Sequence, residues 1–107
     1  MDKTVIDTIS KVKQALLHQG FKVNKVILYG SQATGKTEEY SDIDIMVISD
    51  DFKGMNILKR LETIGLAIAK AKIMEPIEPL GYTEEEFSLK GKGTFIGDEV
   101  KAKGIEI

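Results

Sequence analysis

Two acidic residues set into an apolar run constrain this chain more than any other feature of its sequence. Asp42 and Asp44 begin the run Asp-Ile-Asp-Ile-Met-Val-Ile, residues 42–48. The run predicts a strand, and residues two apart on a strand lie on one face, with Cα atoms about 6.6 Å apart. The flanking isoleucines bury this strand, and two like charges there are costly unless a cation neutralises them. The pair therefore predicts a site for one or two divalent metal ions.

Groups that bind phosphate are expected just upstream, at Gly30-Ser31. The apolar residues 26–29 predict a buried strand that ends at Gly30. Glycine lets a backbone amide approach an anion closely, and the Ser31 hydroxyl and the next amides can point at the same anion. Magnesium prefers oxygen ligands and usually takes one or two carboxylates together with substrate phosphates. The turn and the two aspartates thus indicate a pocket for magnesium and a triphosphate.

Helices are predicted on both sides of these strands. Apolar residues at spacings of three and four predict one helix over 4–19, ended by Gly20, and a second over 57–68. Residues 30–41 are small and polar, and they predict a loop or a short helical turn. The strand at 42–48 therefore follows the first strand after a short connection.

Shorter elements are predicted toward the end of the chain. Residues 73–80 predict a third strand. Pro76 and Pro79 each lack an amide hydrogen, so this strand is expected to be short or to lie at a sheet edge. Thr83 followed by Glu86 resembles a capping box, which predicts the start of another helix.

The last residues complete the predicted fold. Gly91 and Gly93 indicate a turn, residues 94–103 predict a helix, and residues 105–107 predict a closing strand. The fold class is therefore α/β (α+β), a small mixed β-sheet with helices packed on it. A chain of this length has room for one hydrophobic core, so residues 1–107 are expected to form a single domain.

The composition excludes several kinds of chemistry. The 15 lysines and arginines nearly balance the 17 aspartates and glutamates, so no charge excess indicates nucleic acid or membrane binding. The lack of cysteine excludes disulfides, thiolate nucleophiles and zinc-thiolate sites. His18, the one histidine, is expected to be a surface residue near a helix carboxyl terminus. No apolar run reaches the roughly 18 residues needed to span a bilayer, so a cytoplasmic location is expected.

A competing motif overlaps the Gly30 turn. Residues 30–37, Gly-Ser-Gln-Ala-Thr-Gly-Lys-Thr, fit the P-loop pattern G-x-x-x-x-G-K-[ST] at every fixed position. A P-loop requires a strand before it and a long helix after it, but only four residues separate Thr37 from Asp42. The match is therefore interpreted as a coincidence.

The spacing of the two motifs matches a known signature: Gly30-Ser31, ten residues, and then Asp42-Ile43-Asp44. It resembles that of the minimal nucleotidyltransferases of the DNA polymerase β superfamily, and the likeness extends through residues 28–35 and 41–47. The resemblance implies the nucleotidyltransferase fold, with a sheet like the polymerase β palm. It also implies a magnesium-dependent enzyme that transfers a nucleoside monophosphate, AMP from ATP, to a hydroxyl group.

A third carboxylate on a later strand is part of what this resemblance implies. It falls on Glu78, with Glu75 as the runner-up. Asp42, Asp44 and Glu78 would then be the catalytic residues and the ligands of two magnesium ions. Two ions can stabilise the attacking and leaving oxygens of an in-line displacement.

The resemblance implies a role for the turn as well. Gly30 and Ser31 would seat the β- and γ-phosphates, and Ser41 would orient Asp42. Many relatives carry arginine at the position of Thr34. Its loss here predicts weaker triphosphate binding, or transfer of that task to Lys36.

Small proteins similar to this one are often antitoxins. They act with an all-helical ribonuclease of the HEPN type and add AMP to one of its tyrosines, so the resemblance implies such a partner protein. A second hypothesis is a catalytically degenerate binding module that neutralises its partner by occlusion. A bare sheet edge, or an apolar patch around Phe87 and Phe95, could serve a partner, but the sequence does not resolve surface from core. The sequence leaves self-association open.

Overall fold

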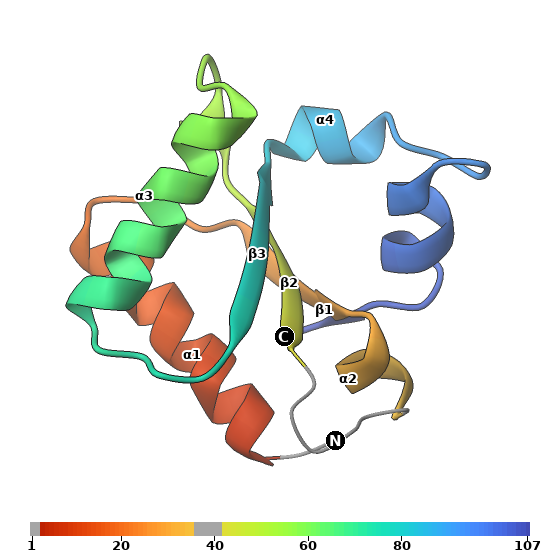
Figure 1. Cartoon of the computed structure of the whole chain (residues 1–107). Helices are drawn as coiled ribbons and strands as arrows, with labels where there is room; N and C mark the ends of the chain where they lie inside the picture. Colours follow the sequence, from red (N-terminus) through yellow and green to blue (C-terminus); the bar gives the residue numbers. More distant parts are fainter. Residues whose placement is uncertain (1–2, 36–41) are drawn as a thin grey trace.

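The computed structural model describes residues 3–35 and 42–107. Its elements form a sheet with helices on both faces (Figure 1). None of the helices in these two stretches is both long enough and apolar enough to cross a membrane. In chain order the elements are α1 (Lys3–His18), β1 (Lys25–Tyr29), α2 (Ser31–Thr34), β2 (Ile43–Ile48), the 3-10 helix η1 (Asp50–Phe52), α3 (Ile57–Lys70), β3 (Ile77–Tyr82), α4 (Glu84–Ser88), the π-helix η2 (Ile96–Lys101) and β4 (Ile105–Glu106).

The sheet is mixed, as predicted. Its strand order is β3-β2-β1-β4. β1 pairs antiparallel with both β2 and β4, whereas β2 and β3 are parallel, joined by a crossover through α3. In Figure 1, α1 and α3 lie on one side of the sheet, and α4 and the blue helix η2 lie on the other. The fold is therefore a small α/β arrangement with a different pair of helices on each face.

Alternation along the strands separates two apolar clusters. Leu28 and Ile45 belong to the cluster beneath α1 and α3. Met46 and Ile48 belong to the other cluster, which also contains residues of α4 and η2. Asp44 lies two and four residues before them on the same strand, so it shares their face. The acidic residues therefore belong to the face that the short helices cover.

The carboxyl end of α1 and the start of α4 have the features that the sequence predicted. Gly20 has a φ of 85°, and beside it the amide of Phe21 donates to the carbonyl of Leu16 at 3.0 Å. These are features of a helix end closed by a left-handed glycine. The capping box is confirmed: the Thr83 amide donates to Glu86 Oε1 at 2.8 Å, and the Glu86 amide donates to Thr83 Oγ1 at 3.1 Å.

Two elements differ from the prediction. β3 begins at Ile77 and ends at Tyr82, so it is shifted toward the carboxyl terminus, and it lies at a sheet edge, where Pro79 is tolerated. The predicted helix over 94–103 is a π-helix, η2, limited to residues 96–101. Periodicity does not distinguish these two helix types over so short a segment.

Arg60 joins its own helix α3 to β3 and α4, and it was not singled out from the sequence. It is 5% exposed, and its guanidinium donates to the carbonyls of Met55 and Gly81. Two further bonds, Nη1 to Oε1 at 2.6 Å and Nη2 to Oε2 at 3.0 Å, reach Glu86 of α4. The hydrogen bond from Arg60 lowers the pKa of Glu86 from 4.5 to about 2. This bidentate pair ties α3 to β3 and α4.

Replacing Glu86 by alanine is expected to destabilise the fold by about 2 kcal/mol, because Arg60 would lose its partner while remaining buried. This figure is below that of a fully buried pair, since the Glu86 side chain is 41% exposed. The pKa of Glu86 is lower in the folded than in the unfolded protein. The pair therefore stabilises the fold fully above pH 4.5, and this stabilisation is lost as the pH falls toward 2. Urea unfolding of Glu86→Ala at pH 7 and pH 3 measures both effects. Glu85→Ala, at an exposed neighbour, is the control and should change little at either pH.

Candidate active site

Three strands bring Tyr29, Asp44 and Glu78 into one row across the sheet. The Cα of Tyr29 pairs with that of Asp44 in the antiparallel register of β1 and β2. The Cα of Asp44 pairs with that of Glu78 in the parallel register of β2 and β3. Paired residues on neighbouring strands point to the same face. The structure thus places Glu78 opposite Asp44, whereas Glu75 lies ahead of β3.

Asp42 lies one residue before β2 and is exposed, so it is outside the observed strand, although the prediction began the strand at Asp42. Its carboxyl group nevertheless interacts with both other acids. A hydrogen bond with Asp42 and the charge of Asp42 raise the pKa of Glu78, and Asp44 raises it further. Burial raises the pKa of Asp44, a hydrogen bond with Glu78 lowers it, and the charge of Asp42 raises it. The three carboxyl groups are therefore close enough to compete for protons.

Competition for protons among clustered carboxylates is relieved when a cation binds between them. Asp44 and Glu78 are therefore suited to a hard divalent ion, for which carboxylate oxygens are the preferred ligands. Within residues 3–35 and 42–107, no group of three or more acidic, histidine or cysteine side chains is arranged to hold a metal ion. Magnesium is usually bound through one or two carboxylates, because it keeps several waters and takes further oxygens from bound phosphates.

Tyr29 was missed by the sequence reasoning, which treated it as the last apolar residue of a strand. It is 8% exposed, and burial, followed by the charges of Asp44 and Glu78, raises the pKa of its phenol to about 12. The phenol is thus a neutral group beside the acids at physiological pH. Its position in the register opposite Asp44, one residue before Gly30, is the signal that identifies it.

Gly30 lies directly against the Asp44 carboxylate. Its φ of 73° and ψ of −154° fall in a region that glycine alone adopts readily. A Cβ atom at Gly30 would overlap Oδ2 of Asp44. The amides of Ala33 and Thr34 donate to the Gly30 carbonyl, and these bonds close the short helix α2. The predicted turn therefore exists, and its lack of a side chain brings backbone and carboxylate together.

The remaining predicted site residues are placed as follows. Ser31 begins α2 and is partly buried. Thr34 is exposed, and its hydroxyl lies 3.4 Å from the carbonyls of Gly30 and Ser31, within its own turn. Lys36 and Ser41 fall outside the described residues, so their predicted roles stay predictions.

The described elements around the Gly30 turn contradict a P-loop. The helix that follows β1 is α2, Ser31–Thr34, which has four residues and is capped by Gly35. β1 and β2 are antiparallel, whereas a P-loop fold requires parallel strands connected by long crossover helices. The expectation that the pattern match is a coincidence is therefore supported.

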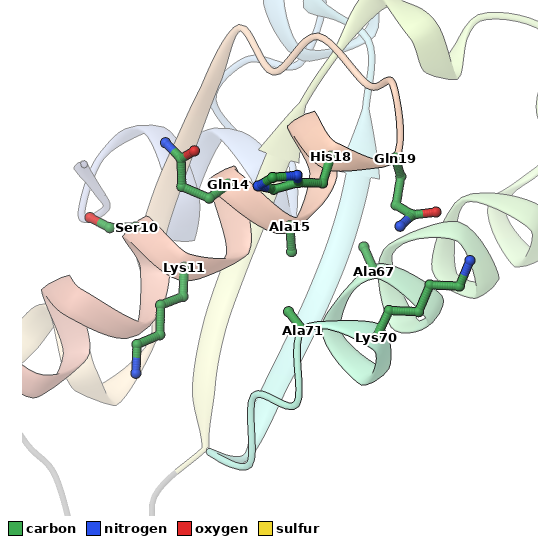
Figure 2. Close-up of a pocket in the computed structure, with 9 residues that line it drawn as sticks. All are labelled: Ser10, Lys11, Gln14, Ala15, His18, Gln19, Ala67, Lys70 and Ala71. Carbon is green, nitrogen blue, oxygen red and sulfur yellow. The ribbon is translucent and has the colours of Figure 1, made fainter.

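A cavity of about 520 Å³ lies on the far side of the sheet, between α1 and α3. Figure 2 shows His18 and Lys11 of α1 on one side of it and Lys70 of α3 on the other, with Ala15 and Ala67 between the helices. None of the three carboxylates lines it. Because these basic and amide side chains come from the helix layer opposite the acidic face, this groove is distinct from the candidate site.

Comparisons with known proteins agree with the fold. The family model described as "Nucleotidyltransferase domain" matches residues 9–100. A protein from Sulfolobus solfataricus, described as a candidate nucleotidyltransferase, has a similar structure with a TM-score of 0.59 and 22% identity; the alignment covers 99% of this chain and 87% of that one. A chain of a toxin-antitoxin structure solved with AMP-PNP gives a TM-score of 0.60 at 18% identity, with 91% and 69% covered.

No curated protein sequence matches the chain significantly. The family match nevertheless covers most of the sequence, including the Gly30 turn and all three acids. Both similar structures share its fold. The chain belongs to the nucleotidyltransferase domain family.

Proposed function

We propose that this protein transfers a nucleoside monophosphate, AMP from ATP, to a hydroxyl group with the help of two magnesium ions. The observation that carries the proposal is the meeting of Asp42, Asp44 and Glu78 beside Gly30. The carboxylates supply oxygen ligands for the ions, and the glycine turn supplies a surface that phosphate oxygens can approach. One site thus offers both of the parts that a magnesium triphosphate requires.

In this reaction an acceptor hydroxyl attacks the α-phosphorus. The bond between the α-phosphorus and the oxygen that bridges it to the β-phosphate breaks, and pyrophosphate leaves. Bound magnesium would supply charge stabilisation at the attacking and leaving oxygens. Asp42 and Asp44 would hold the metal ions. Glu78 would accept the proton of the acceptor hydroxyl, a role that its exposure and its raised pKa support. Gly30 and Ser31 would seat the β- and γ-phosphates, Lys36 would take over phosphate pairing from the missing arginine, and Ser41 would orient Asp42.

The acceptor in this proposal is a tyrosine of a HEPN-type partner, so that the protein acts as an antitoxin. The resemblance of the sequence to the minimal nucleotidyltransferases supports this acceptor, and so does the similar fold of a toxin-antitoxin structure solved with AMP-PNP. The exposed position of Glu78 at the sheet edge also leaves room for a protein substrate to reach the site.

Label transfer tests this proposal directly. The protein is incubated with magnesium, ATP labelled at the α-phosphate, and the protein encoded by the neighbouring gene. Label is expected on a tyrosine of that partner, and Asp44→Asn should transfer none. If wild type and Asp44→Asn leave the partner equally unlabelled, the enzymatic proposal is wrong.

That last outcome would favour the second candidate, a module that binds its partner without catalysis. One observation motivates this alternative: the Thr34 hydroxyl is directed into its own turn, at the position where an arginine could pair with phosphate. Calorimetry with magnesium and ATP separates the two functions. Nucleotide binding that depends on Asp44 supports the enzyme, and its absence supports the module.

Glu78→Gln is expected to lower transfer about a hundred-fold, because the amide neither accepts a proton nor binds magnesium as a carboxylate does. Glu75→Gln is the matched control, since Glu75 lies three residues earlier and outside β3. Its transfer rate should stay within about two-fold of wild type. Single-turnover rates of both variants decide between the two acids. A larger loss for Glu75→Gln would assign the third carboxylate to Glu75.

A further inference from the structure

Phe95 is an exposed aromatic ring beside the candidate active site. Its side chain is 55% exposed, although it touches the buried ring of Tyr29 at a centroid distance of 5.8 Å and an interplanar angle of 81°. Tyr29 is in turn the cross-strand partner of Asp44. The Phe95 ring therefore contacts the residue that faces Asp44. This contact lies on the β1 side of the candidate site, where the Gly30 turn begins.

The backbone that carries Phe95 is held by a closed set of hydrogen bonds. The Thr94 hydroxyl donates to the Gly91 carbonyl at 2.6 Å and accepts from the Gly97 amide at 3.0 Å. The Asp98 side chain accepts from the Gly93 amide at 3.0 Å. The next residue along the chain, Ile96, is buried against the sheet. The exposed ring is thus fixed in place before any ligand binds, which lowers the entropic cost of stacking on it.

The surroundings of Phe95 suit a flat ligand better than an apolar protein surface. Apart from the buried Ile96, its neighbours in sequence are glycines and the exposed polar residues Lys92, Thr94, Asp98 and Glu99. Protein interaction sites usually present contiguous apolar patches, whereas a single exposed ring is sufficient to stack on one base.

We propose that the exposed ring of Phe95 stacks on the nucleobase of the triphosphate bound at the carboxylates. This inference rests on the proposed function and adds the base-binding residue to it. Stacking uses the π-face that every nucleobase has, so Phe95 contributes similarly to ATP and GTP binding. Its contribution is to position the nucleotide, while the carboxylates and the turn bind the metal and the phosphates.

The test compares a ligand that has a base with one that lacks it. Calorimetry measures the Kd of magnesium ATP and of magnesium tripolyphosphate for wild type and Phe95→Ala. ATP binding should weaken about ten-fold in Phe95→Ala, as expected for the loss of one stacked base, while tripolyphosphate binding should be unchanged. Leu89→Ala, at an exposed apolar residue of the same loop region, is the control and should bind both ligands as wild type does.

A second variant provides a direct signal, because the chain contains no tryptophan. Phe95→Trp should restore ATP affinity, and its fluorescence should be quenched by ATP and by GTP but not by tripolyphosphate.

The outcomes separate this inference from the proposed function. Equal weakening of ATP and tripolyphosphate binding in Phe95→Ala would mean that the ring only supports Tyr29, and unchanged ATP binding would mean that no base stacks there. Either result overturns the inference while the proposed function stands. Failure of wild type to bind either ligand with magnesium would overturn both.

Discussion

Substituting asparagine for Asp44 is expected to lower the rate of nucleotidyl transfer about a thousand-fold or more, a loss comparable to removing one preorganised electrostatic group from an active site. The amide has the same shape as the carboxylate but lacks the charge that holds magnesium against the triphosphate. Asp44 is also the acid that the other site residues surround: Tyr29 and Glu78 are its cross-strand partners, and Gly30 lies against its oxygen. Single-turnover transfer from labelled ATP measures the effect.

The same substitution should not destabilise the metal-free protein. Burial raises the pKa of Asp44 above its ordinary value of 3.8, so ionising it in the fold costs free energy. A folded pKa above the unfolded one means that stability is greatest below pH 3.8 and declines as the pH rises through the folded pKa. Without magnesium, Asp44→Asn is therefore expected to melt at or above the wild-type temperature at pH 7.

Two controls accompany the Asp44→Asn experiment. Magnesium with ATP should raise the melting temperature of wild type only, because binding to the folded state stabilises it. Asp7→Asn, on the exposed side of α1, should transfer at the wild-type rate. Wild-type transfer by Asp44→Asn, or a marked loss of stability without metal, would contradict the assignment of Asp44.

Gly30→Ala is expected to abolish transfer and to destabilise the fold by about 3 kcal/mol. The new methyl group would overlap Oδ2 of Asp44, and the φ of 73° with ψ of −154° is strained for any residue with a Cβ atom. Relief of the overlap requires either the turn or the carboxylate to move, and each movement separates the phosphate-binding surface from the metal ligand. Urea unfolding and transfer rates measure the two losses.

Gly35→Ala is the matched control for this prediction. Gly35 ends the same short helix with a φ of 77°, but a Cβ atom there meets nothing within 4 Å. It should therefore cost only the left-handed backbone strain of about 1 kcal/mol and retain most of the activity. Equal effects of the two substitutions would show that backbone strain alone matters and that the contact between Gly30 and Asp44 has no special role.

Local patterns in the sequence predicted most of the elements. The helical spacing of residues 4–19, the apolar run before Gly30 and the capping box of Thr83 and Glu86 depend on neighbouring residues, so their chemistry is visible in sequence. The edge position of β3 is confirmed, and it too was predicted from a local feature, the missing amide hydrogens of its prolines. The π-helix was not predicted, because its difference from an α-helix lies in hydrogen bonding and not in apolar spacing.

Contacts between distant segments were harder to predict. Arg60 was unnoticed because its partner Glu86 lies 26 residues away, and nothing in the spacing of α3 indicates a buried cation. The apolar pattern predicted Tyr29 only as a buried strand residue, because its position opposite Asp44 depends on the register of β1 and β2. The sequence did not resolve whether Phe87 lies at the surface or in the core; it is 7% exposed and packs in the core, so it does not form a partner surface.

The candidate site was predicted in part from chemistry and in part from resemblance. Asp42 and Asp44 follow from acids placed in an apolar strand, whereas Glu78 came from the resemblance alone. Its position opposite Asp44 depends on the parallel register of β2 and β3, which strand patterns do not specify. Asp42 lies before β2, so strand alternation was the wrong reason to place it near Asp44.

Anomalous diffraction from manganese tests the central claim most directly. Manganese takes the same carboxylate and water ligands as magnesium, so crystals are soaked with manganese and a non-hydrolysable ATP analogue. An anomalous peak is expected between the carboxylates of Asp42, Asp44 and Glu78, with the triphosphate bound at the Gly30 turn. A peak elsewhere, for example between α1 and α3, or triphosphate bound away from the three acids, would contradict it.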